Sequence, residues 1–223
     1  MILAYAYERS NGGLVAVDLV EERDGKFFEI ETGLEVKRVI AKMSKSLKNV
    51  VNPDDMISEY GTDALRMYEM VLGDFRDSAP WEPTGIVGVR RFLDRVHTTF
   101  TEGKNLAKDE MKTMKLLHKT VKKVGEDIED YKFNTAISSL MILLNEGLPT
   151  DSEFQTEWKE KFAILLHPFA PHMAEEIWNI LGHKDSIYDA GWPSYDEWML
   201  IDDEVTIAVQ VNGKLRGTFT FLN

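Results

Sequence analysis

The 223-residue sequence contains no cysteine. Disulfides and thiolate metal sites are therefore excluded, which fits a cytoplasmic protein. Long apolar runs are also missing, and no segment approaches the roughly 20 residues that a transmembrane helix needs. The first residues show no secretory signal pattern. We predict a cytoplasmic location and no membrane partner.

Positive charge is scarce as well. The 26 lysines and arginines face 38 aspartates and glutamates, which gives a formal net charge of −12. This balance argues against generic nucleic-acid binding, although a local cluster of cations can still bind phosphates. The five histidines lack acidic partners at ligand spacing, so we predict no metal site. His167 and His172 flank two prolines and are interpreted as structural.

The hydrophobic content of 43% is ordinary for a globular protein, and its periodicity changes twice along the chain. Before residue 42 the pattern predicts strands, at 14–20, 26–31 and 35–40, with a hairpin signal at Asp24-Gly25. From Pro53 onward, apolar residues recur at spacings of three and four, which indicates helices. Short connections favour antiparallel neighbours and therefore a helix bundle. A first predicted helix begins at Pro53, and a second begins at Thr62 or Asp63 and stops at Gly73. The later predicted helices are 85–102, 109–130, 134–146, 152–166 and 171–181.

The last residues alternate again between apolar and polar side chains. Asn212-Gly213 separates two alternating runs, which predicts a tight β-hairpin. Phe219 and Phe221 would need a covering surface. The predicted fold class is α+β, predominantly α: an antiparallel helix bundle preceded by a small β subdomain and followed by a hairpin. The predicted domains are a β-rich segment at 1–41, a loop with two helices at 42–84, the bundle at 85–200 and the hairpin at 201–223.

The pentapeptide Lys42-Met43-Ser44-Lys45-Ser46 is the candidate site with the clearest chemistry. Two lysines three residues apart, with two hydroxyls between and beside them, can surround a polyphosphate with charges and donors. Lys45 could stabilise a departing pyrophosphate, and such charge stabilisation is often the largest catalytic contribution. The alternative for an isolated pentapeptide of this kind is a solvated basic loop.

The neighbouring residues favour the functional interpretation. The pentapeptide and the residues up to Arg66 together resemble the signature loop and following helices of class I aminoacyl-tRNA synthetases. The segment 167–178 (HPFAPHMAEEIW) is similar to a bundle helix of the leucyl, isoleucyl and valyl enzymes. Three further segments, 85–96 (GIVGVRRFLDRV), 117–128 (LHKTVKKVGEDI) and 209–217 (VQVNGKLRG), resemble the leucyl enzymes.

The resemblance implies a function that composition alone does not. It implies that the loop contacts ATP, supplied with Mg²⁺, and that the bundle binds leucine tRNA during formation of leucyl-tRNA through leucyl-adenylate. By matching the family motif, Lys42 and Lys45 become the catalytic candidates, and Met43, Ser44 and Ser46 complete the ATP-binding loop. Met43 is expected to pack and anchor that loop.

The family's second ATP signature, His-x-Gly-His, is missing upstream of the loop. The nearest match, Ile180-Leu181-Gly182-His183, lacks the first histidine and follows the loop. The chain therefore resembles the C-terminal portion of a bacterial-type leucyl-tRNA synthetase. Met1 is interpreted as an internal residue, and the N-terminal catalytic and editing domains as missing partners from the same polypeptide. We expect this portion to be inactive alone and monomeric.

Cations on three elements are candidate tRNA contacts, each with a solvated surface as the alternative. Asp63 and Arg66 are instead expected to cap a helix and to pair on its surface. Two other functions stay open: a non-catalytic RNA-binding or protein-interaction module, and the same portion of an isoleucyl or valyl enzyme. The candidate tRNA contacts are Arg90, Arg91 and Arg95 on one helix, Lys119 and Lys122 on the lysine-rich face of the next, and Lys214 and Arg216 on the hairpin.

Overall fold

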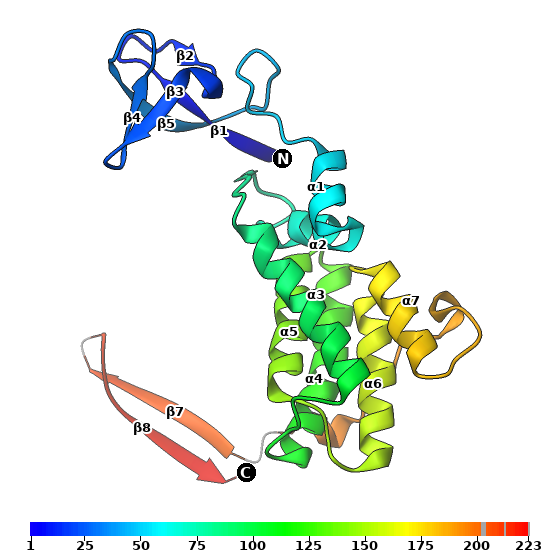
Figure 1. Ribbon diagram of the computed structural model, residues 1–223. Coiled ribbons are helices and arrows are strands. Elements are labelled where there is room, and N and C mark those ends of the chain that lie inside the picture. Colours follow the sequence, from blue (N-terminus) through cyan, green and yellow to red (C-terminus); the bar gives the residue numbers. More distant parts are fainter. Residues whose placement is uncertain (202–203, 212, 223) are drawn as a thin grey trace.

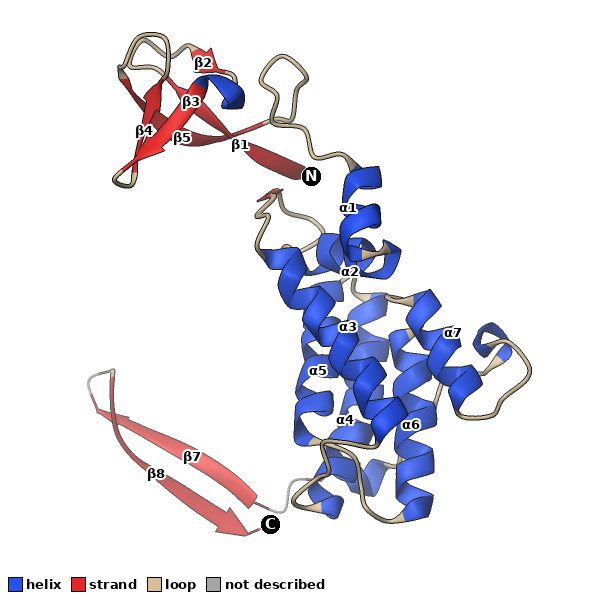
Figure 2. Cartoon of the chain, viewed as in Figure 1, coloured by secondary structure: helices blue, strands red, loops and turns tan. Residues whose placement is uncertain are grey.

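A small β subdomain, a set of helices and a separate hairpin follow one another along the chain (Figure 1). This computed structural model describes residues 1–201, 204–211 and 213–222. The arrangement confirms the predicted α+β class, in which helices predominate and successive helices of the bundle run antiparallel (Figure 2).

The β subdomain is a sheet with strand order β2-β1-β5-β4-β3, and a sixth strand, β6, pairs in parallel with the start of β1. Strand β1, which pairs with β2, β5 and β6, was not among the predicted ranges, although its alanines Ala4 and Ala6 are buried in regular alternation. The strands are β1 (Ile2–Glu8), β2 (Leu14–Val15), β3 (Val20–Arg23), β4 (Lys26–Glu29), β5 (Glu35–Ala41) and β6 (Ala79–Pro80).

The predicted hairpin at Asp24-Gly25 is confirmed. Both residues have positive φ, 51° and 77°, as a two-residue hairpin turn requires. The single strand predicted at 14–20 is wrong: the 3-10 turn η1 (Val17–Leu19) interrupts it between β2 and β3. A run of Val and Leu favours strand locally, but here the chain must turn to pass from one side of the sheet to the other.

Seven α-helices are present among the described residues, close to the predicted ranges. Asn52 caps the first helix by accepting a hydrogen bond from the Asp54 amide, and Pro53 occupies its first position. The helices are α1 (Pro53–Tyr60), α2 (Thr62–Val71), α3 (Gly85–Glu102), α4 (Glu110–Glu129), α5 (Phe133–Glu146), α6 (Ser152–Leu166) and α7 (Pro171–Ile180). Two 3-10 turns follow, η2 (Ile187–Asp189) and η3 (Glu197–Leu200).

The core lies inside the bundle and extends to α2. Trp158 is fully buried and stacks on Phe162 with ring centroids 4.8 Å apart, and Trp178 is 9% exposed. Both tryptophans are therefore core residues. Burying one large apolar side chain stabilises the fold by about 1.5–3 kcal/mol, so the bundle's apolar stripes account for its assembly.

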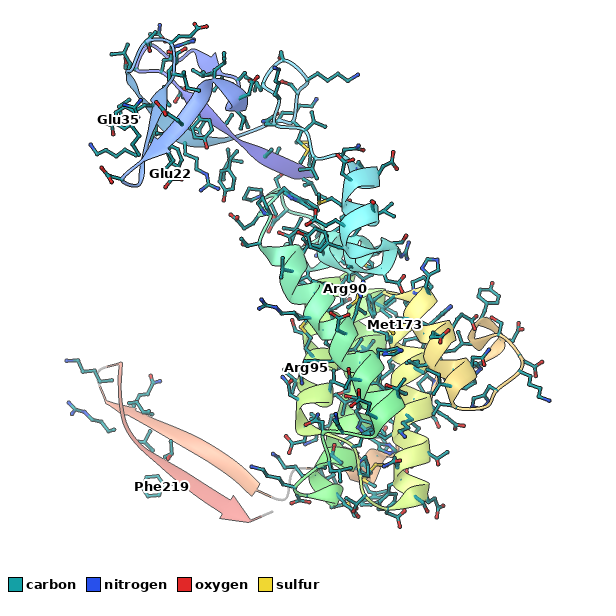
Figure 3. The ribbon with its side chains drawn as sticks, viewed as in Figure 1. Glu22, Glu35, Arg90, Arg95, Met173 and Phe219 are labelled. Atoms are coloured by element: carbon teal, nitrogen blue, oxygen red, sulfur yellow. The ribbon has the colours of Figure 1, made fainter. Side chains whose placement is uncertain are left out.

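The predicted C-terminal hairpin is confirmed as β7 (Glu204–Val211) and β8 (Lys214–Leu222), paired antiparallel. Asn212 of the predicted turn and the side chain of Phe221 lie outside the described residues. Phe219 is 58% exposed, and Figure 3 shows it on the strand away from the bundle, so the bundle does not cover it. No helix in the described part of the chain is long and apolar enough to cross a membrane.

Candidate functional site

The loop at 42–50 joins the end of β5 to the start of α1, between the β subdomain and the helices (Figure 1). Its lysines Lys42 and Lys45 are exposed, and neither ammonium group has a hydrogen-bond or salt-bridge partner among the described residues. Met43 packs against the hydrophobic core, in the anchoring position expected for it. The loop therefore carries two exposed, unpaired ammonium groups on a backbone that Met43 anchors to the core.

Asn49 holds the first half of this loop. It is 7% exposed, and its Oδ1 accepts a hydrogen bond of 2.8 Å from the Ser44 amide. Its Nδ2 donates to the carbonyl oxygens of Tyr5 at 3.3 Å and of Lys42 at 3.5 Å. One buried amide thus joins both ends of the loop to strand β1.

The second half is held by η1 and by the loop's own hydroxyls. The Val17 amide donates to the Leu47 carbonyl at 2.9 Å, and the Lys48 ammonium pairs with Asp18. Ser44 Oγ accepts from the Leu47 amide at 3.2 Å and lies 3.1 Å from Ser46 Oγ. The loop is consequently fastened to the β subdomain on both sides of Lys45.

The three arginines of α3 differ in their surroundings. Arg90 donates to the Tyr60 carbonyl at 3.1 Å and pairs with Asp94 at 2.9 Å, while Arg95 donates to Asn145 Oδ1 at 2.7 Å. Figure 3 shows both projecting from α3. Arg91 is exposed, and its guanidinium has no polar partner in the described part of the chain. Arg91 is the most available of the three for an external anion.

The lysine-rich face of α4 is partly covered by the protein itself. The segment 192–197 packs along this helix, and Lys122 lies 5.9 Å from the ring centroid of Tyr195. Lys122 also approaches Glu126 at 4.0 Å, and Lys119 is half-buried. A fully solvated lysine face is thus not what the structure shows.

His118, on the same helix, is 1% exposed and forms a hydrogen bond with the segment 192–197. Its Nδ1 accepts from the Asp196 amide at 2.9 Å, which leaves Nε2 to face Glu157 at 3.3 Å. Burial, together with the nearby Lys161 ammonium, lowers the pKa of His118 despite the neighbouring carboxylates. The histidine is therefore neutral at pH 7.

Asp63 caps a helix, as expected, but that helix is α7 and not its own, and Arg66 bonds a distant carbonyl instead of making the expected surface pair. Asp63 lies in the first turn of α2 but accepts from the Met173 amide at 2.7 Å and lies 2.8 Å from His172 Nδ1. It caps the start of α7. Arg66 donates to the Pro168 carbonyl at 3.4 Å. Sequence spacing could not indicate partners so far away. His172 has a structural contact, as predicted.

On the hairpin, Lys214 and Arg216 are exposed on β8. Neither side chain has a polar partner among residues 1–201, 204–211 and 213–222. The predicted site residues therefore lie in three places, the loop, the bundle and the hairpin, and the structure does not bring them together.

Comparison with known proteins gives two family matches, one in the part that contains the lysine loop and one in the part that contains the bundle and the hairpin. Residues 27–79 match the family of class I tRNA synthetases (I, L, M and V), and residues 112–222 match the anticodon-binding domain of tRNA ligase. The chain is 47% identical to leucine–tRNA ligase of Borrelia hermsii (strain HS1 / DAH) and 48% identical to that of Borrelia turicatae (strain 91E135). Each match covers 97% of this chain and 26% of the relative.

The chain belongs to the leucine–tRNA ligase family.

A solved structure agrees with this membership. The LeuRS in a ternary complex of Agrobacterium radiobacter K84 agnB2 LeuRS, tRNA and LeuAMS superposes with a TM-score of 0.66 at 28% identity. The match covers 81% of this chain and 25% of that one. The chain thus spans about a quarter of the length of these leucine–tRNA ligases, and neither the isoleucyl or valyl alternative nor the binding module is favoured.

Within this leucine–tRNA ligase segment, Asn49 is the residue that sequence reasoning missed. An asparagine four residues after Lys45 is inconspicuous, because asparagine is common in loops. Only its burial and its three hydrogen bonds distinguish it. The described residues contain no cluster of histidine, aspartate or glutamate that could hold a metal ion.

Proposed function

We propose that this chain is the segment of a leucine–tRNA ligase that supplies the ATP-contacting loop, 42–46, and the tRNA-binding helices. The reaction joins leucine to its tRNA in two steps, through leucyl-adenylate. The proposed functional units keep the predicted boundaries, 1–41, 42–84, 85–200 and 201–223. A monomeric state and a cytoplasmic location remain predictions.

The observation that carries the proposal is the pair of unpaired ammonium groups, Lys42 and Lys45, on an attached loop within the class I match. When the leucine carboxylate attacks the α-phosphate of ATP, negative charge accumulates on the departing pyrophosphate. A nearby ammonium stabilises that charge in the transition state. Because the loop backbone is already bonded to the β subdomain, little reorganisation is needed to present Lys45.

Mg²⁺ is proposed to arrive with the nucleotide. The described residues offer no carboxylate cluster for it, and Mg²⁺ is commonly bound through substrate phosphates with few protein ligands. Its charge would neutralise the phosphate oxygens. The chain itself then contributes the ammonium groups of Lys42 and Lys45 and the exposed hydroxyl of Ser46 beside them.

The tRNA surface is proposed to include α3, α4 and the hairpin. The anticodon-binding match over 112–222 and the tRNA in the Agrobacterium complex support this part. Arg91, Lys214 and Arg216 contribute most, because their charges are exposed and unpaired among the described residues. Arg90, Arg95, Lys119 and Lys122 are secondary contacts.

The decisive experiment is leucine-dependent ATP–pyrophosphate exchange by a full-length leucine–tRNA ligase that carries these 223 residues as its matching segment. Replacing Lys45 by alanine should lower the exchange rate about 10²–10³-fold, the usual cost of losing one such donor, and should leave the leucine KM nearly unchanged. Lys184→Ala, an exposed lysine after α7, is the matched control. Unchanged exchange in the Lys45 variant would overturn the role of the loop.

The 223-residue chain alone should show no exchange, because half a site cannot hold both reactants. Robust activity from the purified chain, with contaminating enzyme excluded, would contradict this part of the proposal.

A further inference from the structure

Asn49 uses its whole side-chain amide to shape the lysine loop. The oxygen accepts from the Ser44 amide, and the nitrogen donates toward two carbonyls, those of Tyr5 and Lys42. An amide has one acceptor oxygen and two N–H donors, so its hydrogen-bonding groups are all engaged. Aspartate lacks the donors, and alanine lacks both functions.

These bonds fix the position of the backbone at Lys45. Lys45 follows Ser44, whose amide is bound to Asn49, and precedes Leu47, whose carbonyl is bound to the Val17 amide. The positive φ of Lys48, 51°, completes the turn and returns the chain toward Asn49. A change at Asn49 therefore moves the backbone that carries Lys45, while leaving its ammonium group intact.

The bonds also tie the loop to strand β1, because Tyr5 belongs to that strand. Removing these bonds leaves buried polar groups without partners, and this cost favours other loop conformations. Lys45 would then occupy its working position for only part of the time.

We propose that Asn49 is a positioning residue for the reaction: it holds the loop so that Lys45 is placed at the nucleotide phosphates. This inference rests on the proposed ATP role of the loop. Asn49 itself touches no phosphate; it acts through Lys45.

Exchange kinetics in the same full-length ligase test this directly. Asn49→Ala should lower the ATP–pyrophosphate exchange rate about 10- to 100-fold, since a misplacement of about 1 Å can cost 10²-fold, with the leucine KM unchanged. Asn179→Ala, an exposed asparagine of α7 with no side-chain hydrogen bond in the described part of the chain, should behave as the parent.

A double variant separates positioning from a general structural effect. If Asn49 acts through Lys45, adding Asn49→Ala to Lys45→Ala should lower the rate by less than about 2-fold further, because coupled groups are not additive. Independent, multiplied losses would overturn the inference while leaving the loop's ATP role intact. No loss in Lys45→Ala would overturn the proposed function, and the inference with it.

Amide hydrogen exchange in the 223-residue chain measures the order of the loop without depending on catalytic activity. Asn49→Ala should speed exchange of the Ser44 amide more than 10-fold, whereas Asn49→Asp, which keeps an acceptor, should preserve more of its protection. Amides in α4 should be unaffected, which shows that the bundle remains folded. Equal protection of Ser44 in parent and Asn49→Ala would overturn the inference.

Discussion

At the residue scale, buried polar side chains connect elements that are distant in sequence. Asp63 is 8% exposed and reaches the start of α7, with His172 109 positions further along the chain. A carboxylate at a helix N-terminus satisfies unpaired amides and interacts favourably with the helix dipole. This contact joins the helices that follow the lysine loop to the bundle.

Asp63→Ala should therefore lower the free energy of unfolding by about 1–3 kcal/mol, because the Met173 amide and the His172 ring lose a buried acceptor. Asp63→Asn, which keeps the shape, should cost less. The measurement is urea unfolding followed by circular dichroism. Asp94→Ala is the control: its pair with Arg90 is exposed, and such pairs contribute about 0.5 kcal/mol or less. Equal losses in both alanine variants would refute the capping role.

His118 makes the stability of the chain depend on pH. Its pKa in the folded protein is lowered from the ordinary value of 6.5 by burial, so the unfolded chain takes up the proton first as the pH falls. The free energy of unfolding should be insensitive to this group above about pH 6.5 and should decrease below it, by at most about 1.4 kcal/mol per pH unit.

Urea titrations between pH 5 and 7.5 measure this dependence. His118→Gln should flatten the decline between about pH 6.5 and 5. His97→Gln, at an exposed histidine on α3, should retain it. A parental slope in the His118 variant would assign the pH dependence to other groups.

At the element scale, short connections determine how the helices pack. After α5, Gly147 has φ 101° and ψ 175°, a conformation open almost only to glycine. A side chain there would also meet the Asn105 carbonyl oxygen at 2.6 Å. The Asn105 and Leu148 backbones can therefore bond at 2.8 Å, which brings the α3–α4 and α5–α6 connections together.

Gly147→Ala should destabilise the chain by more than about 2 kcal/mol, because backbone strain adds to a backbone clash. Gly88→Ala is a matched control on α3. This glycine is exposed and helical, and a methyl group would meet nothing within 4 Å, so alanine should stabilise by about 0.5–1 kcal/mol. Thermal unfolding of the two variants should shift in opposite directions; a similar shift in both would contradict this account.

At the scale of the whole molecule, the negative net charge disfavours binding to tRNA, the proposed partner. A chain with a formal charge of −12 repels RNA at long range, so binding must depend on a few local cations. The structure divides these between α3, α4 and the hairpin, and internal acceptors engage Arg90, Arg95 and Lys122. We therefore expect weak and salt-sensitive binding of tRNA by the isolated chain.

Replacing Arg90, Arg91 and Arg95 together by alanine should weaken leucine tRNA binding and flatten its salt dependence. Each phosphate contact contributes about 0.9 to the slope of log affinity against log salt on a duplex. Arg91→Ala alone should account for most of the change, because the other two guanidiniums have partners within the chain. Filter binding at several salt concentrations measures both quantities, with Lys184→Ala as control. Parental affinity and slope in the triple variant would leave these arginines as a solvated surface.

Periodicity along the chain was enough to determine the helices, the final hairpin and the α+β class, because 3.6- and 2-residue repeats are local properties. The lysine pentapeptide indicated phosphate chemistry only together with its resemblance to the family motif, and its role stays a proposal. Only the tertiary structure decided the rest. The 3-10 turn η1 interrupts the strand predicted at 14–20, and residues 192–197 pack against the lysine-rich face of α4. Asp63 and Asn49 form hydrogen bonds with residues that are distant in sequence. These features depend on burial and on contacts between residues far apart in sequence, which spacing does not encode.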